Sequence, residues 1–209
     1  MDKIFSYWEG KKPDYIKMCQ EILYKNAGDF EIVILDSCEN PFNLAINQKV
    51  DFLKANLIAE NGGFWIDADM IVMKDLKPLL KLLDKSDFIG IPGFFGAKKK
   101  APILIDWINA MNEIISADLS FSDLIKPLLD HPMYKPYKYL THEMITPIWH
   151  TEDEFPDFFS SKQLADFVTH NTYIVTLYNS LFTQEFKSMT GDEILSKDWL
   201  ISRMFKKAL

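Results

Sequence analysis

Cysteine is scarce in this sequence, which has only Cys19 and Cys38 among its 209 residues. Their spacing matches no metal-binding motif, and no secretory signal precedes them. We therefore expect two reduced thiols in a packed interior, and neither a disulfide framework nor a zinc site.

The sequence also lacks long apolar runs and an excess of positive charge. No run approaches the ~18 residues that span a bilayer, so we expect a cytoplasmic, bacterial type of protein that is soluble or touches the inner face of the membrane peripherally. Lysine and arginine number 23 against 30 aspartate and glutamate residues, a formal net charge of −7. Because nucleic-acid binding needs a cationic surface, we expect no nucleic-acid partner.

Apolar residues suffice for one packed core, since 48% of the chain is hydrophobic and 14% is aromatic. Strand-like and helix-like segments alternate along the first part of the chain. Their order is β-α-β-α-β-α-β, which favours an α/β fold with a mostly parallel central sheet, flanking helices and ligands at the carboxyl ends of strands. The expected strands are Lys3–Trp8, Glu31–Leu35, Phe64–Ala68 and Asp87–Ile91, and the expected helices are Pro13–Ala27, Asn43–Glu60 and Leu76–Leu83.

The rest of the chain is patterned less regularly. We expect helices at Ile103–Ile115 and Phe121–Leu129, loops over the site from His131 to Phe159, and a strand at Thr172–Leu177. A last helix, Asp192–Lys207, is amphipathic and either lies on a membrane or packs on the domain.

Two alternating carboxylates, Asp67 and Asp69, end the apolar strand that follows Gly62 and Gly63. In an extended segment residues i and i+2 point to the same side, so both carboxylates can converge on one hard cation. Such oxygen ligands suit Mg²⁺ or Mn²⁺. About four acid-x-acid pairs are expected by chance in a chain this acidic. The strand and the glycine pair set this one apart from the others.

Asp51 and Lys54 stand three residues apart on the expected helix before the glycine pair, and therefore share one face. Such a pair is commonly a solvated surface ion pair, and the alternative is that both side chains reach a ligand together. The neighbouring aspartates favour the ligand interpretation.

The block from Asp51 and Lys54 through Leu57, Gly62-Gly63 and Asp67-Ala68-Asp69 resembles the DxD glycosyltransferases of the sugar-binding-region and capsular-polysaccharide-synthesis type, which are similar to glycosyltransferase family 32. The opening segment Ile4–Gly10 resembles the start of the capsular-synthesis proteins. The resemblance covers about the first third of the chain. It implies a single GT-A (Rossmann-like) domain over residues 1–209, with 1–96 binding the nucleotide sugar and 97–209 forming the acceptor side and the C-terminal helix.

The resemblance also implies roles for individual residues. Asp67, with Ala68, would contact the donor sugar or ribose, Asp69 would hold a divalent cation against the diphosphate, and Asp51 would bond donor hydroxyls. These three aspartates are the catalytic candidates. Lys54 stands where the family usually has arginine, so it offers a point charge and no planar fork. Ser6, Tyr7 and Trp8 leave the first strand where the nucleotide is expected, and an aromatic ring there can stack on a uracil-like base; Trp8 as an ordinary core residue is the alternative.

The segment Tyr173–Ser180 is similar to the closing strand of the family, which typically carries histidine at the position of Thr176 and tryptophan at that of Tyr178. Asn179 and Ser180 retain oxygens that can complete a Mn²⁺ or Mg²⁺ shell with Asp69. His170 replaces the missing histidine only if its loop folds back.

Two other polar segments have an interpretation as ligand contacts and an interpretation as ordinary surface. His142 and Glu143 either position an acceptor hydroxyl or form an ordinary loop pair. Lys98–Lys100 form either a basic flap that touches diphosphate or an anionic membrane, or a solvated turn.

The sequence thus predicts a metal-dependent glycosyltransferase that moves a sugar from a nucleotide-diphosphate donor, UDP-linked by preference, to a saccharide or lipid-linked saccharide in bacterial surface-polysaccharide synthesis. The resemblance implies retention of anomeric configuration. Two alternatives remain open: a catalytically degenerate nucleotide-sugar-binding protein, indicated by Lys54, Thr176 and Tyr178, and a haloacid-dehalogenase-type phosphatase, in which Asp67 would be the nucleophile and Asp69 the general acid.

Overall fold

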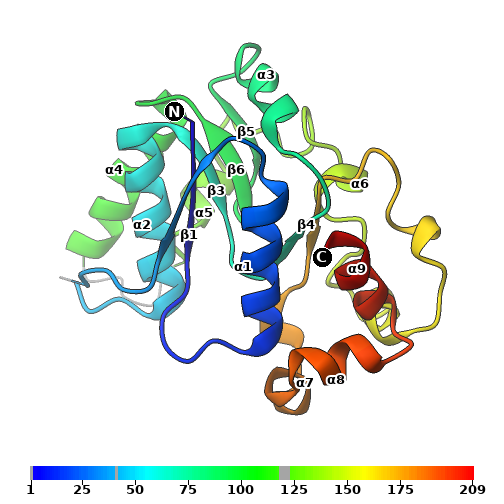
Figure 1. Cartoon of the computed structure of the whole chain (residues 1–209). Coiled ribbons are helices and arrows are strands. Elements are labelled where there is room, and N and C mark those ends of the chain that lie inside the picture. The colour runs from blue at the N-terminus through cyan, green and yellow to red at the C-terminus, as the bar shows by residue number, and fades with distance from the viewer. Residues whose placement is uncertain (1, 41, 118–122) are drawn as a thin grey trace. The chain divides into compact units, whose positions relative to one another are not determined.

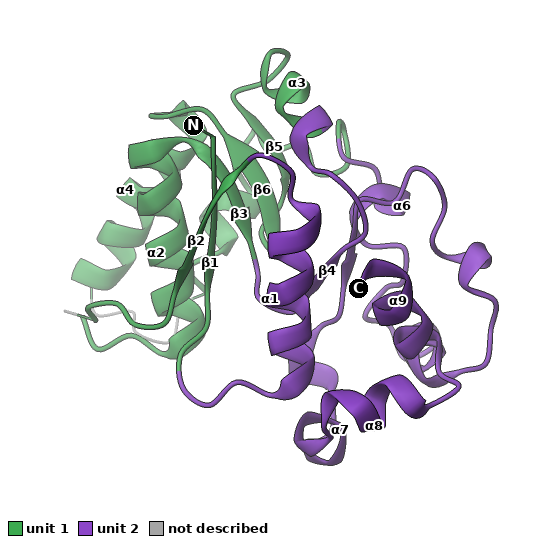
Figure 2. Cartoon of the chain, viewed as in Figure 1, with its two compact units in different colours: residues 1–9, 30–66, 79–139 green, residues 10–29, 67–78, 140–209 purple. Residues whose placement is uncertain are grey.

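The computed structural model of the chain describes residues 2–40, 42–117 and 123–209 (Figure 1). The chain divides into two compact units (Figure 2). Unit 1 comprises Met1–Glu9, Phe30–Ile66 and Leu79–Tyr139, and unit 2 comprises Gly10–Asp29, Asp67–Pro78 and Leu140–Leu209. The single domain with halves 1–96 and 97–209 stays a prediction.

Unit 1 is built on a five-stranded sheet of order β2-β1-β3-β6-β5. β1 pairs in parallel with both β2 and β3, whereas β6 is antiparallel to β3 and to β5. β1, β2, β3 and β5 therefore run in one direction and β6 runs against them, so the sheet is mostly parallel, as the alternation predicts. The strands are β1 (Lys3–Tyr7), β2 (Glu31–Leu35), β3 (Gly63–Ile66), β5 (Phe88–Ile91) and β6 (Phe94–Ala97).

Helices cover one face of this sheet (Figure 1). The register aligns Phe5 with Trp65 and Trp65 with Phe95, and these side chains join the core that packs against α2 and α4. Phe64 belongs to the opposite face, where it stacks on Phe94 with ring centroids 5.6 Å apart. The helices of unit 1 are α2 (Ile46–Asn61), α3 (Leu80–Leu83), α4 (Pro102–Ser116) and α5 (Lys126–Leu129).

The glycine pair ends α2 and starts β3, as the sequence predicts. Both glycines have positive φ, +71° at Gly62 and +100° at Gly63. A Cβ on Gly63 would lie 2.4 Å from the carbonyl oxygen of Lys3 in β1, and one on Gly62 would lie 2.9 Å from the backbone nitrogen of Lys99. The turn at Gly62-Gly63 thus requires glycine for both its backbone conformation and its close approach to neighbouring backbone.

Unit 2 combines helices with a two-stranded antiparallel sheet of β4 and β7. Its α-helices and strands are α1 (Asp14–Asn26), β4 (Met70–Val72), α6 (His142–Ile145), β7 (Ile174–Thr176), α7 (Gln184–Ser188), α8 (Gly191–Ser196) and α9 (Leu200–Ala208). Its 3₁₀ turns are η2 (Phe155–Phe159), η3 (Leu164–Asp166) and η4 (Asn179–Leu181), and η1 (Lys77–Leu79) spans the boundary between the units.

An aromatic cluster forms much of the core of unit 2. Phe182 lies at its centre, with ring centroids 5.4 Å from Tyr15 and 4.3 Å from Phe186. Trp199 packs edge-on against Phe159 at 5.2 Å. Trp199 has an extended backbone conformation, so the expected helix Asp192–Lys207 is wrong as one element and is broken into α8 and α9.

The apolar face of α9 is covered by protein. Its apolar side chains are fully buried: Leu200, Ile201, Met204 and Phe205. This face therefore packs within unit 2 and is not available to bind a membrane. No helix in the described part of the chain is long and apolar enough to cross a bilayer. Cys19 is buried and Cys38 half-buried, and both thiols are free.

Several expected elements are shorter or differ in kind. The strand expected at Phe64–Ala68 ends at Ile66, because the chain leaves the sheet there and turns into β4. The strands β4 and β6 are additional to the expected ones. Of the helix expected at Phe121–Leu129, Lys126–Leu129 is present, and residues 121–122 lie outside the described residues. Short helical turns, α6 and η2, interrupt the loops expected from His131 to Phe159.

Candidate functional site

Asp51 and Lys54 form a buried ion pair in α2. The Lys54 Nζ lies 2.5 Å from Asp51 Oδ1, and the side chains are only 5% and 15% exposed. Burial raises the pKa of Asp51, and the Lys54 charge lowers it only in part. The solvated surface pair is therefore wrong. Both groups are held in a low-dielectric position where their charges act strongly on whatever contacts them.

Ser6, Tyr7 and Trp8 lie at the carboxyl end of β1, as expected. The Ser6 hydroxyl is buried and has no hydrogen-bond partner among the described residues. Tyr7 is buried on the face that packs against α2, whereas Trp8 is half-exposed beyond the strand. Tyr7 is thus a core residue and Trp8 retains a surface for a ligand.

A charged cluster that the sequence analysis missed surrounds Tyr7. Its hydroxyl donates to Glu9 Oε2 at 2.7 Å, and the same oxygen accepts from Lys49 Nζ at 2.8 Å. Burial and the Glu9 bond raise the pKa of Tyr7 to about 12, and the Glu9 bond raises that of Lys49. Glu9 and Lys49 are 40 residues apart and no local pattern links them, so the sequence carried no signal for this cluster.

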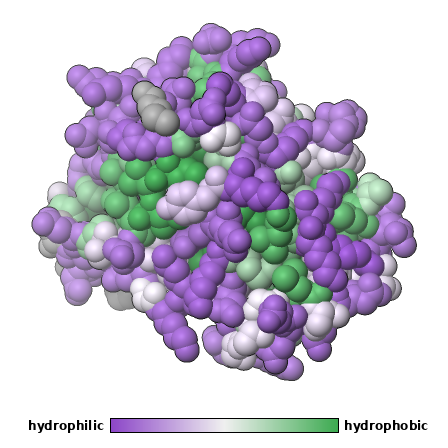
Figure 3. All heavy atoms as spheres, viewed as in Figure 1, coloured by the Kyte–Doolittle hydropathy of each residue, from purple (hydrophilic) through white to green (hydrophobic). Residues whose placement is uncertain are grey.

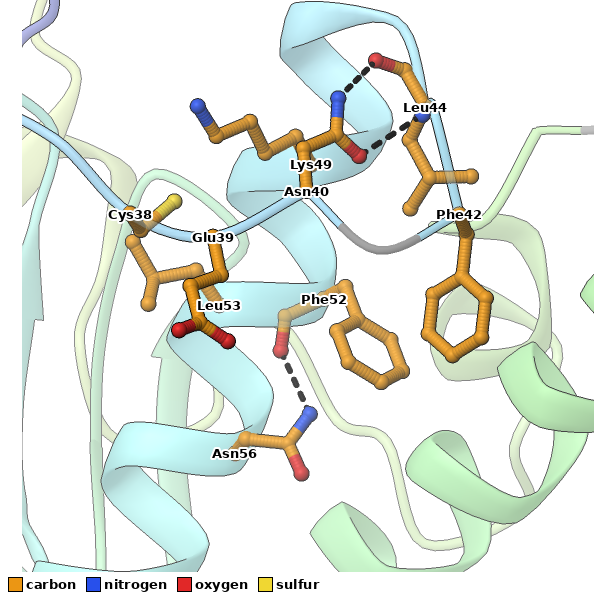
Figure 4. Close-up of a pocket in the computed structure, with 9 residues that line it drawn as sticks. All are labelled: Cys38, Glu39, Asn40, Phe42, Leu44, Lys49, Phe52, Leu53 and Asn56. Carbon is orange, nitrogen blue, oxygen red and sulfur yellow. Dashed lines mark hydrogen bonds between the residues drawn. The ribbon is translucent and has the colours of Figure 1, made fainter.

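A pocket of about 260 Å³ opens beside the first half of α2 (Figure 4). It contains neither Asp51 nor Lys54. Phe42 and Phe52 meet edge-to-face at 5.6 Å on one side of it, and the Asn56 amide lies next to Phe52. Its lining residues are Cys38, Glu39, Asn40, Phe42, Leu44, Lys49, Phe52, Leu53 and Asn56.

In unit 2, Asp67, Ala68 and Asp69 link the end of β3 to β4, with Ala68 and Asp69 in a turn. Asp67 and Asp69 are half-buried and Ala68 is buried. The Asp69 carbonyl accepts from the Leu177 N–H at 2.9 Å, which extends the β4–β7 ladder by one step. That ladder brings Asp69 to the segment after β7.

Asn179 contacts Asp69 through its backbone, and its part in a metal shell stays a prediction. Its backbone N–H donates to Asp69 Oδ2 at 2.7 Å, and its side-chain Oδ1 accepts a hydrogen bond from the Tyr15 hydroxyl. Tyr178 adopts a left-handed backbone, φ +55°, which is unusual for a bulky residue. It allows the N–H groups on both sides of Tyr178 to reach Asp69. Ser180 is exposed at the next position.

The charge of Asp69 is compensated only in part by the protein. Burial raises the pKa of its carboxyl group, although the Asn179 bond and the charge of Lys187 lower it. A divalent cation would supply the missing positive charge, and carboxylate and amide oxygens each keep a lone pair beyond the bonds described. No group of three or more His, Cys, Asp or Glu side chains suited to a metal occurs in the described residues. A metal here would therefore depend on Asn179, Ser180 and solvent or donor oxygens.

Other candidate ligands are engaged elsewhere. The Thr176 hydroxyl donates to the Ile145 carbonyl at 3.1 Å, and His170 is exposed, with its carbonyl bound by the Lys74 ammonium group. His142 and Glu143 lie in α6 rather than in a loop, and Glu143 accepts a hydrogen bond from Thr169. Lys98 pairs with Asp87 at 2.8 Å in the turn after β6.

Solved structures share this arrangement of strands and helices. A glycosyltransferase involved in the glycosylation of the major capsid of PBCV-1 aligns with 89% of this chain and 96% of its own, with a TM-score of 0.55 and 13% identity. The glycosyltransferase GlyE of Streptococcus pneumoniae TIGR4 aligns with the whole chain and 64% of its own, with a TM-score of 0.53 and 11% identity. The fold is that of a GT-A glycosyltransferase.

At this level of identity the likeness establishes the GT-A fold and leaves the reaction to be inferred from the site. The sequence matches no family model and none of the curated proteins. The GT-A fold differs from the fold that a haloacid-dehalogenase-type phosphatase would have. Asp69 is also followed directly by β4 (Met70–Val72), whereas the phosphatase motif normally continues into a Gly-Thr or similar turn.

Proposed function

We propose that this chain is a metal-dependent glycosyltransferase that moves a sugar from a nucleotide-diphosphate donor, UDP-linked by preference, to a saccharide acceptor. The observation that carries the proposal is the half-buried Asp69 carboxylate, which accepts the Asn179 N–H in a GT-A fold and whose charge the protein only partly offsets. Bacterial capsular or other surface-polysaccharide synthesis is the proposed setting, with a saccharide or lipid-linked saccharide as acceptor.

Each unit has its own part in this proposal. In unit 2, Asp69, Asn179 and Ser180 would hold Mn²⁺ or Mg²⁺, and Asp67 with Ala68 would contact the donor sugar or ribose. Bound there, the cation would offset negative charge that develops on the departing nucleoside diphosphate. In unit 1, Asp51 would bond donor hydroxyls, Lys54 would supply positive charge, and Trp8, next to Ser6 and Tyr7, would stack on the base.

The buried Asp51–Lys54 pair supports this role for α2. An ion pair taken out of water contributes little net stability compared with apolar residues of the same size. Its two side chains hold each other in fixed positions, so a donor would meet oriented groups without ordering them first. Asp51 offers acceptor oxygens for sugar hydroxyls, and the ammonium group of Lys54 offsets the negative charge of the Asp51 carboxylate.

Calorimetric titration tests the donor site. UDP, UDP-glucose, UDP-galactose and UDP-N-acetylglucosamine are titrated with and without Mn²⁺ into the wild type, Asp69→Asn and Asp166→Asn, an exposed carboxylate of unit 2. We expect binding that needs both Mn²⁺ and Asp69 and that Asp166→Asn leaves unchanged. Failure of every uridine ligand on folded protein would discard the UDP assignment, and binding that persists in Asp69→Asn would discard the metal site.

A second candidate is a nucleotide-sugar-binding protein without turnover. The Thr176 hydroxyl donates a hydrogen bond to the Ile145 carbonyl, so this position offers no metal ligand in place of the family's histidine. Donor hydrolysis that rises with Mn²⁺ and is lost in Asp69→Asn would exclude this candidate. Tight donor binding with neither hydrolysis nor transfer would establish it.

The last part of the proposal is that the transferred sugar retains the anomeric configuration that it has in the donor. Proton NMR of the first product formed reports the anomeric configuration directly, before mutarotation or further turnover. A product with the configuration of the donor agrees with retention, and the opposite anomer overturns it.

A further inference from the structure

Four aromatic rings of unit 2 follow one another, beginning with Tyr178, the residue before Asn179 in the chain. Tyr178 lies with its ring centroid 5.3 Å from His150, His150 lies 5.8 Å from Trp149, and Trp149 lies 3.8 Å from His142. We call Tyr178, His150, Trp149 and His142 the aromatic row. The row starts between Leu177 and Asn179, whose N–H groups both bind Asp69.

The aromatic row is accessible and its backbone is fixed. His150 is exposed, and the other three rings are half-buried. The Trp149 N–H donates to Glu154 Oε2 at 3.0 Å, and the Glu154 N–H donates to Thr151 Oγ1 at 3.3 Å, which closes the loop behind Trp149. Half-exposed aromatic rings on a fixed backbone bind ligands without a large cost in conformational entropy.

The chemistry of the row fits an uncharged saccharide. The C–H groups on one face of a pyranose ring carry partial positive charge and pack on the negative face of an indole ring. Neutral imidazole both donates and accepts hydrogen bonds, which suits hydroxyl groups. Burial lowers the pKa of His142, which favours the neutral ring. The flanking residues Glu143, Glu152 and Asp153 are exposed carboxylates that would repel an anionic ligand.

We propose that the aromatic row is the acceptor subsite, in which Trp149 stacks on a neutral sugar ring of the acceptor and His150 binds its hydroxyls. This inference rests on the proposed function, because only a glycosyltransferase would use the bound saccharide as an acceptor. Saccharide binding itself can be measured without turnover. Specificity for neutral over anionic saccharides follows from the carboxylates beside the row.

Ligand-detected NMR provides the test. Saturation-transfer spectra are recorded with lactose, cellobiose, maltose and 3′-sialyllactose on the wild type, Trp149→Ala, Trp149→Phe and His150→Ala. Tyr24→Ala serves as the matched control because Tyr24 is a 59% exposed aromatic of unit 2 outside the row. Circular dichroism and the unfolding midpoint confirm that each variant is folded. If Trp149→Ala destabilises the protein because the Trp149–His142 contact is lost, His150→Ala still tests the aromatic row.

We expect at least one neutral disaccharide to bind, with affinity lowered about tenfold or more in Trp149→Ala, retained within about threefold in Trp149→Phe and unchanged in Tyr24→Ala. Sialyllactose should bind more weakly than lactose. Equal binding by wild type, Trp149→Ala and His150→Ala would overturn the inference, and so would the absence of binding by every neutral probe.

Donor hydrolysis separates this inference from the proposed function. Trp149→Ala should raise the KM for a transferred acceptor, whereas the control Tyr24→Ala should leave both that KM and Mn²⁺-dependent UDP-sugar hydrolysis unchanged. Loss of hydrolysis in the wild type would count against the proposed function, whereas saccharide binding at Trp149 would still support the aromatic row.

Discussion

The backbone N–H of Asn179 donates a hydrogen bond of 2.7 Å to the carboxylate of Asp69, although 110 positions separate the two residues. The pairing of β4 with β7 makes this contact. Met70 pairs with Thr176, so the segment before Met70, which contains Asp69, lies next to the segment after Thr176, which contains Asn179. The two ends of the sequence resemblance, the D-x-D motif and the closing segment, therefore meet within one unit.

The Asp69–Asn179 contact predicts different effects for two substitutions. Asp69→Asn retains an oxygen acceptor, so the free energy of unfolding should stay within about 1 kcal/mol of the wild type, whereas Mn²⁺-dependent donor binding should be lost. Asp69→Ala leaves the half-buried Asn179 N–H without its acceptor and should cost about 1–3 kcal/mol. Urea unfolding measures both variants. A loss of stability in Asp69→Asn as large as in Asp69→Ala would contradict the prediction.

The Asp51–Lys54 pair predicts a strong coupling. Lys54→Met leaves the buried Asp51 carboxylate without its cation and should lower the free energy of unfolding by about 3 kcal/mol or more. The double substitution Asp51→Asn with Lys54→Met removes both charges and should recover most of that loss. A double-mutant cycle in urea gives the coupling energy, and additive losses would show that the pair is effectively solvated.

Gly63 should resist substitution more than another glycine with positive φ. Gly63→Ala combines φ +100° with a Cβ 2.4 Å from the Lys3 carbonyl oxygen and should cost roughly 3 kcal/mol. Gly10→Ala is the matched control, because Gly10 has φ +84° and no atom within 4 Å of the added Cβ; it should cost about 1 kcal/mol. Thermal unfolding measures the difference, and equal losses would show that β1 and β3 can move apart.

His142 predicts a loss of stability in mild acid. Burial holds its pKa below the ordinary value of 6.5, against the raising effect of the nearby Glu154 charge. The unfolded chain therefore binds a proton at a higher pH than the folded protein does. The stability contribution is present above about pH 6.5 and declines as the pH falls through that value towards the folded pKa. The free energy of unfolding of the wild type should thus fall from pH 7.5 to pH 5.5, and it should fall less in His142→Gln. An equal decline in both proteins would assign the effect to other groups.

Local sequence patterns predicted much of unit 1. The strand Glu31–Leu35 has the expected bounds, and the helix-like segment Asn43–Glu60 followed by Gly62-Gly63 located α2 and its end. These signals are readable because strand and helix periodicity and a glycine stop depend on neighbours within a few residues. The additional strand β6 is not of this kind, because it pairs with β3, and even the closest registered residues, Ile66 and Phe94, are 28 positions apart along the chain.

The sequence by itself determined the α/β class, the glycine turn, the aspartates after β3 and the face that Asp51 and Lys54 share. Only the tertiary structure decided that this ion pair is buried, that Asp69 meets Asn179, that the terminal helix breaks at Trp199, and that Tyr178, His150, Trp149 and His142 form a row. The physical reason is the range of the interactions. Helix and turn signals act over a few residues, whereas burial and strand pairing depend on side chains that are distant in sequence and meet only after the core has formed.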